Sequence, residues 1–346
     1  MIASLPLWAL LAAFAVGAAV VWGAGTRLAG YAVVIAERTG ISGAFIGVML
    51  LGLITSLPEV ATGATSALRG NAELGVNNLL GGVAFQVVVI AAADLALRRR
   101  AITASLPNPA VMLQAVLAIV ILAVALAGTI VGDVPAFGLG LWSGALVLIY
   151  VGAMALLQRA GGDESWVAPR GKVPKRRERP EEGGAAKDRS NLVLGLLTFA
   201  AALVILAAGS ILTLLADSIA EETGIGSGMI GLVLLAFATS LPELSSAIGA
   251  VRLRQPGMAI GDVFGGNISD VALIALIDAV YDGPPVLNSI STLSSLAALL
   301  GILLTAIYLI GMLRRRPEQA ARLGYDSLAV LVVYAAGLTL LWNVAH

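Results

Sequence analysis

The residues of this chain that are best suited to chemistry lie in two identical five-residue strings. They are Thr55-Ser56-Leu57-Pro58-Glu59 and Thr239-Ser240-Leu241-Pro242-Glu243, and each lies inside a long apolar stretch. A carboxylate in such surroundings costs free energy unless a cation or a proton compensates its charge. A proline in a helix leaves the carbonyl four residues earlier without its N–H donor. Each string therefore offers hydroxyl, carbonyl and carboxylate oxygens together, and these are the ligands that Na⁺ and Ca²⁺ prefer.

One such string alone could be a proline kink, in which the Thr and Ser hydroxyls bond back to the preceding turn. The repeated glutamate favours a cation site instead, because no basic side chain lies within reach in the same apolar stretches. Further oxygen ligands follow Glu59 and Glu243 at matched spacings, first Asn78 and Asp262, then Gln86 and Asp270. Asn78 and Asp262 stand closer to the starts of their predicted helices and could cap them instead.

The sequence thus predicts one metal site near the middle of the membrane, built from two halves. Three carboxylates there could hold one Ca²⁺ with a proton or a monovalent ion, or up to three monovalent cations. If Ca²⁺ and the monovalent ions competed for the same carboxylates, the protein would exchange one kind of ion for the other. The candidate ligands are the carboxylates Glu59, Glu243 and Asp270, the amide of Gln86, the hydroxyls of Thr55, Ser56, Thr239 and Ser240, and Asn78 and Asp262.

Composition indicates the setting of this site. The 346 residues are 59% hydrophobic and 12% charged, whereas a soluble protein carries about 25% charged residues. Apolar stretches of about 20 residues, the length that spans a bilayer, recur along most of the chain. The chain has no cysteine, and its one histidine is His346, which excludes disulfides, thiolate chemistry and an imidazole proton relay. We expect the first apolar stretch to be a retained membrane helix, because no basic segment precedes it.

We therefore predict an all-α polytopic membrane protein with ten transmembrane helices. The predicted helices cover residues 6–35, 43–67, 74–97, 104–130, 136–158, 191–220, 227–251, 257–280, 289–313 and 324–345.

The two halves of the chain are internal repeats at a constant offset. Residues 35–41 match 219–225, the two strings match, and the Gly81-Gly82 pair matches Gly265-Gly266, all without a gap. Five helices separate equivalent positions, so the two five-helix repeats must cross the membrane in opposite directions. Inverted repeats with interrupted helices are typical of secondary transporters.

Charge predicts the orientation of the repeats. Nineteen of the 21 Lys and Arg residues fall in loops on one side, which we assign to the inside. The prediction is a first repeat over 1–158 with its N-terminus outside, a cytoplasmic linker over 159–190, and a second repeat over 191–346 with its C-terminus outside.

The strings, the Gly-Asp-Val-Phe-Gly-Gly-Asn stretch at 261–267 and the inverted repeat resemble the sodium/calcium exchanger family, part of the cation/calcium antiporter superfamily. The resemblance implies alternating access, with the second, third, seventh and eighth helices holding the ions. It also implies that the long first and sixth helices slide across this core. The family's ligands carry over onto Glu59, Glu243, Asp270 and the hydroxyls of both strings.

This chain departs from the family at several of these positions. The family usually has Gly-Ser-Asn in both repeats, whereas both serines are glycines here, Gly82 and Gly266, and Val83 replaces the first asparagine. The usual Asn or Asp of the third helix is Gln86. These changes remove hydroxyls that the family uses for Na⁺. They therefore weaken the expectation of Na⁺ as driving ion more than the expectation of Ca²⁺ as substrate.

The expected function is secondary active Na⁺/Ca²⁺ antiport, and the alternative is antiport of H⁺ against Ca²⁺ or another divalent cation. A channel is disfavoured by the two-sided repeat, and a sensor by the short linker. A hydrolase using Glu59 and Glu243 is disfavoured because no HExxH motif is present, so we expect no enzyme activity. We expect no cofactor, inorganic cations and the lipid bilayer as partners, no nucleic acid, and a prokaryotic cell membrane.

Overall fold

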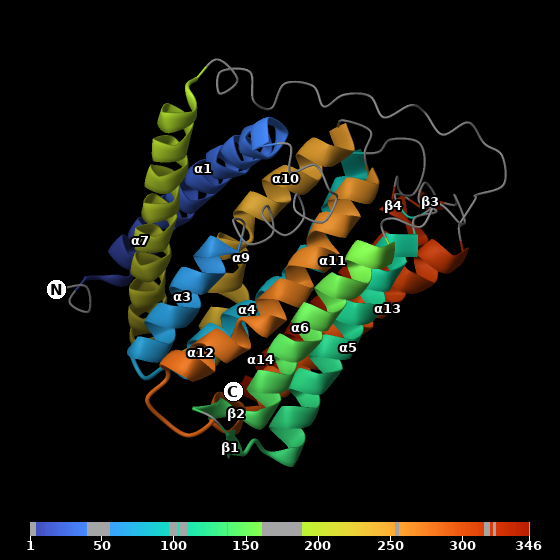
Figure 1. The fold of residues 1–346 in the computed structure, drawn as a ribbon. Helices are drawn as coiled ribbons and strands as arrows, with labels where there is room; N and C mark the ends of the chain where they lie inside the picture. The colour runs from blue at the N-terminus through green and yellow to red at the C-terminus, as the bar shows by residue number, and fades with distance from the viewer. Residues whose placement is uncertain are drawn as a thin grey trace.

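The computed structural model shows a bundle of long helices (Figure 1). It describes residues 5–39, 56–96, 103, 109–136, 138–160, 189–252, 256–314, 319–320 and 323–345. In this part of the chain eight helices are long and apolar enough to cross a membrane, or nine when a bent pair counts as one span. The predicted helix over 43–67 is described only from residue 56 onward, and the linker prediction falls mostly outside the described residues.

The first repeat contains α1 (Leu7–Thr39), α3 (Leu57–Leu68), α4 (Ala72–Ala96), α5 (Pro109–Val131), β1 (Pro135–Ala136), β2 (Leu139–Gly140) and α6 (Leu141–Ala160). The second repeat contains α7 (Asn191–Thr223), α8 (Ser227–Ile230), the π-helical η3 (Gly231–Leu235), α9 (Ala236–Thr239), α10 (Leu241–Arg252), α11 (Pro256–Ala272), α12 (Ile274–Val280), the 3₁₀ turn η4 (Val286–Asn288), α13 (Thr292–Arg314), β3 (Gln319–Ala320), β4 (Leu323–Gly324) and α14 (Tyr325–Ala345).

The internal repeat is confirmed at the level of secondary structure. Both ends of α1 recur in α7 at one fixed offset, and the same offset relates α3 to α10 and the β1–β2 hairpin to the β3–β4 hairpin. This offset is 184 residues, the same as the separation between Gln86 and Asp270. The repeat therefore extends beyond the segments in which sequence matches are visible.

The inversion of the repeats is visible in the two short helices that follow the strings. Both α3 and α10 begin near the middle of the molecule, and they run toward opposite ends of it (Figure 1). The carboxylates of Glu59 and Glu243 lie in the first turn of these helices. The repeated strings are thus brought to the centre of the bundle from opposite directions.

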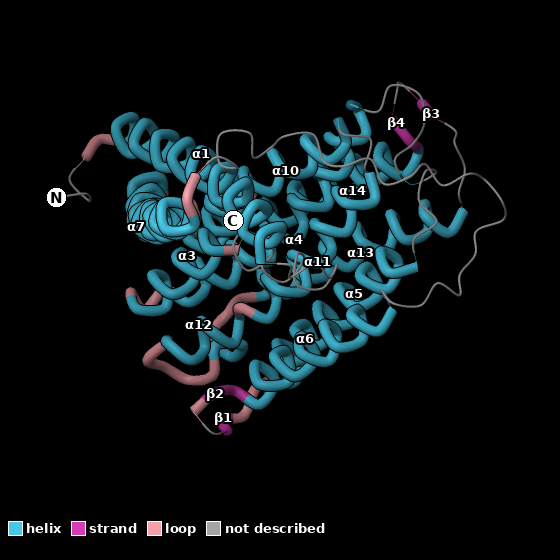
Figure 2. The backbone as a smooth tube through the Cα atoms, turned by 45° about the horizontal axis from the view of Figure 1, so that its top comes forward, coloured by secondary structure: helices cyan, strands magenta, loops and turns pink. Residues whose placement is uncertain are grey.

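The long helices α1 and α7 pack extensively against each other and stand along one side of the bundle (Figures 1 and 2). Two polar contacts join α7 to the α3–α4 unit. The hydroxyls of Thr65 and Ser210 lie 2.9 Å apart, and Asn71 Nδ2 donates to Asp217 Oδ1 at 2.7 Å. The other helices form the larger part of the bundle, and α4 runs through its middle.

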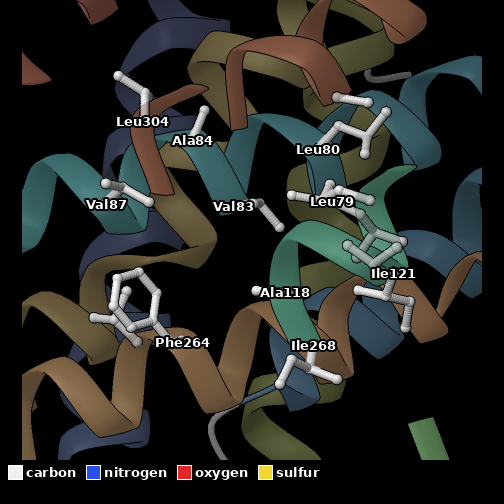
Figure 3. Packing of buried hydrophobic residues seen from close by; sticks show 14 of the residues in the cluster. Leu79, Leu80, Val83, Ala84, Val87, Ala118, Ile121, Phe264, Ile268 and Leu304 are labelled. Carbon is white, nitrogen blue, oxygen red and sulfur yellow. The ribbon is translucent and has the colours of Figure 1, made fainter. Parts of the chain in front are cut away.

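Burial singles out α4 as the central helix. Its apolar window is 83% buried, against 22% for α1 and 11% for α14. Side chains from several of its faces pack against residues of α5, α11 and α13, as Figure 3 shows for Leu79, Val83 and Val87. A helix that is apolar all round fits this position, because it has neighbours on every side.

The structure corrects the predicted helices in three places. Ala136, Leu139, Gly140 and Gly324 belong to two-residue β-ladders and not to helices, so the all-α prediction holds except for these hairpins. The predicted helix over 227–251 is broken, with a bend of 42° after Thr239. The predicted helix over 257–280 is interrupted between α11 and α12 at Leu273.

Buried carboxylates at equivalent positions fix the hairpins. In the first repeat, Asp94 Oδ2 accepts bonds from Gly324 N and Ser327 Oγ, both at 2.8 Å. In the second, Asp278 accepts bonds from Gly140 N and Val286 N, both at 2.6 Å. Each aspartate therefore holds the start of the last helix of the opposite repeat.

We expect Asp278→Asn to lower the free energy of unfolding by roughly 2 kcal/mol, because two hydrogen bonds to a charged group become weaker or are lost. Thermal melting in detergent measures this effect. The matched control is Asp282→Asn, since Asp282 is exposed near the same end of α12. Equal melting temperatures for Asp278→Asn and the control would contradict the structural role of Asp278.

Candidate functional site

The two strings form the same local structure in both repeats. Ser56 has φ −79° and ψ 8°, and Ser240 has φ −85° and ψ 7°, a conformation outside the regular helix. Helical backbone hydrogen bonding starts at each serine: Val60 N donates to Ser56 O at 2.9 Å, and Leu244 N donates to Ser240 O at 3.1 Å. Each serine thus directly precedes a short helix that carries the string glutamate in its first turn, where the helix dipole favours a negative charge.

Asp270 lies where the two repeats meet. Its Oδ1 accepts a bond from Ser56 Oγ at 2.9 Å, and its Oδ2 accepts a bond from Gln86 Nε2 at 2.9 Å. Gln86 and Asp270 occupy equivalent positions, so the two repeats touch at corresponding residues. The equivalent bond from Ser240 to Gln86 is not formed, and both Ser240 Oγ and Gln86 Oε1 are buried without a hydrogen-bond partner among the described residues.

Asn78 belongs to a polar network in the same region. Its Nδ2 donates to Thr62 Oγ1 at 2.8 Å, and its Oδ1 accepts from Thr239 Oγ1 at 3.3 Å. In the second repeat, Ser246 Oγ lies 2.8 Å from Asp262 Oδ2, which repeats the Thr62–Asn78 contact. Asn78 and Asp262 lie inside α4 and α11 and not at their starts, so the alternative that they are caps is wrong.

Glu59 is the least compensated carboxylate of the site. It is 1% exposed, and neither carboxylate oxygen has a hydrogen-bond partner among the described residues. The negative charges of Glu243 and Asp270 are near enough to repel it, and the Thr239 hydroxyl lies nearby. Buried groups without a partner are rare in folded proteins, and a bound cation is one explanation for them.

The shape of the site limits how it could hold an ion. Within the described part of the chain, no three acidic or imidazole groups converge closely enough to hold one metal ion between them. A cation beside Glu59 would therefore use one or two carboxylates together with hydroxyl, amide and backbone oxygens. Such mixed oxygen sets are normal for Ca²⁺, which takes six to eight ligands.

Gly82 and Gly266 face this site. A Cβ on Gly82 would lie 3.6 Å from Ser240 Oγ, and a Cβ on Gly266 would lie 3.4 Å from Gln86 Oε1. These are ordinary contact distances, so a side-chain Cβ would fit at both positions. The two lost hydroxyls are therefore missing from the site itself and not from a remote surface.

The structure brings together most of the residues predicted from the sequence. Contacts and charges link Glu59, Glu243, Asp270, Gln86, Ser56, Thr239 and Asn78, with Ser240 next to Thr239. Asp262 contacts Ser246 of α10, and Thr55 lies outside the described residues. Sequence reasoning missed Thr62 and Ser246, which bond to Asn78 and Asp262. Their signal was present, because both stand three residues after a string glutamate and match across the repeats.

Comparison with known proteins agrees with this architecture. The "Inner membrane protein YrbG" of Escherichia coli (strain K12) is 24% identical over 322 residues, which cover 90% of this chain and 91% of that protein. Among solved structures, the H⁺/Ca²⁺ exchanger CAX is similar with a TM-score of 0.71 and 14% identity, over 97% of this chain and 85% of that one. The sodium-calcium exchanger NCX_Mj is similar with a TM-score of 0.59 and 16% identity, over 96% and 99% of the two chains.

A family model supplies the assignment. The model described as "Sodium/calcium exchanger protein" matches residues 9–158 and 193–343, so it covers most of both repeats. Together with the repeated helices, this match identifies a multi-pass membrane protein of the cation/Ca²⁺ antiporter type. The chain belongs to the sodium/calcium exchanger family.

Proposed function

We propose that this protein is a secondary active antiporter that exchanges Ca²⁺ for Na⁺ by alternating access at the site around Glu59, Glu243 and Asp270. The observation that carries the proposal is the buried carboxylate of Glu59, which has no hydrogen-bond partner in the part of the chain that the structure describes and lies beside two further carboxylates. Three negative charges at the centre of an apolar bundle require cations or protons for compensation. Because either Ca²⁺ or Na⁺ can neutralise the same carboxylates, binding of one ion can replace binding of the other, which is the chemical basis of exchange.

The helix breaks support alternating access. The helix that contains the second string is broken at Ser240, Ser56 precedes α3 at the equivalent position, and α3 and α10 leave the centre toward opposite ends (Figure 1). A cation held between them can be exposed to one side or the other by movement of one part of the bundle against the rest. The pair α1 and α7, which stands along one side, is the natural moving part.

H⁺/Ca²⁺ antiport is the second candidate, and a specific observation favours it. Gly82 and Gly266 face the site without the hydroxyl that a serine would supply, which weakens the case for Na⁺ more than the case for Ca²⁺. The H⁺/Ca²⁺ exchanger CAX shares the fold with a TM-score of 0.71. In this alternative, the three carboxylates would bind protons in place of Na⁺.

For orientation, we propose that residues 1–158 form the first repeat with its N-terminus outside, that 159–190 form a cytoplasmic linker, and that 191–346 form the inverted second repeat. The distribution of Lys and Arg supports this arrangement, because basic loops remain in the cytoplasm. The likeness to an Escherichia coli protein named as an inner membrane protein supports a prokaryotic cell membrane as the location.

Uptake of ⁴⁵Ca²⁺ into proteoliposomes tests the proposal. Vesicles loaded with Na⁺ and diluted into Na⁺-free buffer should accumulate ⁴⁵Ca²⁺, whereas an outward H⁺ gradient alone should not drive uptake. The reverse pattern would establish the second candidate. No uptake under either gradient, by protein that is folded and inserted, would refute both.

Gln86→Asp is expected to change the ion preference of the transporter. The variant places a fourth carboxylate next to Asp270, with which the Gln86 amide is now hydrogen-bonded at 2.9 Å. Two facing carboxylates repel each other unless a proton or a cation lies between them. Competition of Na⁺, H⁺, Mn²⁺ and Sr²⁺ with ⁴⁵Ca²⁺ uptake measures the preference. An unchanged order of competition would mean that Gln86 only packs against Asp270.

A further inference from the structure

The long helices α1 and α7 each cross one of the short string helices at a glycine. Gly25 of α1 and Gly209 of α7 occupy equivalent positions of the two repeats. A Cβ on Gly25 would lie 2.7 Å from Pro242 Cγ, and a Cβ on Gly209 would lie 2.7 Å from Ala61 Cβ and 3.3 Å from Pro58 O. These distances are shorter than an ordinary van der Waals contact, so each glycine lets the long helix lie directly against a string helix.

The two crossings differ in register. Pro58 and Pro242 are equivalent, but the closest approach to Gly209 comes from Ala61, three residues later in α3. In the described part of the chain, the atoms of other helices that come within 4 Å of the same point on Gly25 all belong to Pro242. In a state midway between the two end states, equivalent helices would cross in equal register. The α1–α7 pair is therefore displaced from the midpoint, toward the end of the molecule at which α3 finishes.

Two hydrogen bonds hold α7 in this displaced position. Thr65 Oγ1 donates to Ser210 Oγ at 2.9 Å, and Asn71 Nδ2 donates to Asp217 Oδ1 at 2.7 Å. Asn71 is itself fixed, because its Oδ1 accepts a bond from Leu74 N at 3.2 Å. A sliding movement of one helical turn, about 5 Å, exceeds the range of a hydrogen bond and would break both contacts.

The other half of the molecule cannot form the equivalent bonds. The residue equivalent to Thr65 is Gly249 in α10, and the residue equivalent to Asp217 is Val33 in α1. Neither glycine nor valine has a polar side-chain atom, so each equivalent pair lacks one of its two partners. When the α1–α7 pair slides to the opposite end of its path, two bonds are lost and their equivalents are not gained.

We propose that Asn71 and Asp217, together with Thr65 and Ser210, form a latch that favours one end state of the transport cycle. The favoured state is the one in which the α1–α7 pair is displaced toward the end of α3. The inference rests on the proposed alternating access, but it requires neither a particular substrate nor a particular counter-ion. Asp217 is therefore a positioning residue, which acts on the ion site only through the movement of α7.

The latch lies close to solvent. Ser227 Oγ donates to Asn71 Oδ1 at 3.4 Å, and Ser227 also lines an open cavity beside Glu73. The first residues of α4, α8 and α13 and the last residues of α14 form this cavity. Hydrogen bonds that compete with water are weaker than bonds in a dry interior. Such a latch can bias the equilibrium between the end states and still open in every cycle.

Distances between two spin labels test the latch. The chain has no cysteine, so Gln158→Cys and Glu222→Cys provide unique labelling sites on exposed residues. They lie in the last turns of α6 and α7, which finish at opposite ends of the bundle (Figure 1). Pulsed electron paramagnetic resonance on this doubly labelled parent, in nanodiscs without Ca²⁺, should give one main distance. Asp217→Val introduces the residue of the other repeat and should add a distance shorter by up to about 5 Å.

The population ratio of the shorter to the longer distance should rise at least about tenfold in Asp217→Val, because a hydrogen bond to a charged group is lost. Thr65→Val removes the other bond and should shift the ratio in the same direction. Asp217→Asn keeps an oxygen that can accept the bond from Asn71, so it should stay closer to the parent. Ser218→Val is the matched control, since the Ser218 hydroxyl donates to Leu214 O of its own helix at 3.0 Å. It should leave the distances unchanged.

Two results would overturn the latch. One is an unchanged distance distribution in both Asp217→Val and Thr65→Val. The other is a parent in which the shorter distance already dominates. Uptake of ⁴⁵Ca²⁺ by the unlabelled parent decides separately on antiport, so a failed latch and a failed transport proposal are distinguishable.

Discussion

Glu243→Gln is expected to reduce Ca²⁺ transport by at least about 100-fold, because it removes one of three carboxylates that compensate the cations and keeps the size of the side chain. Glu243 is 6% exposed and lies in the first turn of α10, close enough to Glu59 for the two charges to repel each other. Loss of that repulsion should leave the folded state as stable as before. Initial rates of gradient-driven ⁴⁵Ca²⁺ uptake measure the effect.

The matched control for this variant is Glu222→Gln, which removes an exposed carboxylate at the end of α7. The control should transport at the wild-type rate and melt at the wild-type temperature. Transport at the wild-type rate by Glu243→Gln would contradict the assignment of Glu243 to the ion site. A large drop in its melting temperature would instead show that the carboxylate is needed for folding.

Gly81→Ala is expected to have the largest effect on stability, about 3 kcal/mol. A methyl group on Gly81 would fall well inside van der Waals contact with the Leu232 backbone, carbonyl oxygen included. A methyl group on Gly231 would lie 2.5 Å from the carbonyl oxygen of Leu74. The backbones of α4 and η3 therefore touch directly, and neither can retreat without moving Asn78 and the break at Ser240.

The neighbouring residue provides the control. Gly82→Ala adds the same methyl group one residue later, where the nearest atom is Ser240 Oγ at 3.6 Å. A change in helix propensity cannot explain a difference between the two variants, because both replace a glycine of α4 by alanine and gain the same propensity. Thermal melting in detergent should show a large drop for Gly81→Ala and little change for Gly82→Ala. Equal melting temperatures would refute the close contact of α4 with η3.

The sequence predicted the architecture well because its signals are local and repeated. Membrane-length apolar stretches indicate helices regardless of their neighbours, and the proline in each string indicates a break. The match between the strings also predicted that Glu59 and Glu243 belong to one site. The family assignment confirms the resemblance that these residues carry.

Other features depend on packing between distant segments and left no readable signal. The hairpins β1–β2 and β3–β4 contain two residues per strand, too few for a periodic pattern. The cap alternative for Asn78 could be dismissed only once its bonds to Thr62 and Thr239 were seen. The cavity beside Glu73 is formed by four helix ends that meet only in the folded chain.

The hydrogen bond between Gln86 and Asp270 joins equivalent positions of two inverted repeats, so it lies on the axis that relates them. In a symmetric dimer of a single repeat, a residue on that axis meets its own copy. Such a dimer can hold only an even number of carboxylates, since every acid appears twice. Joining the repeats in one chain permits glutamine on one side and aspartate on the other. The odd total of Glu59, Glu243 and Asp270 is therefore a property that a symmetric dimer of identical repeats cannot possess.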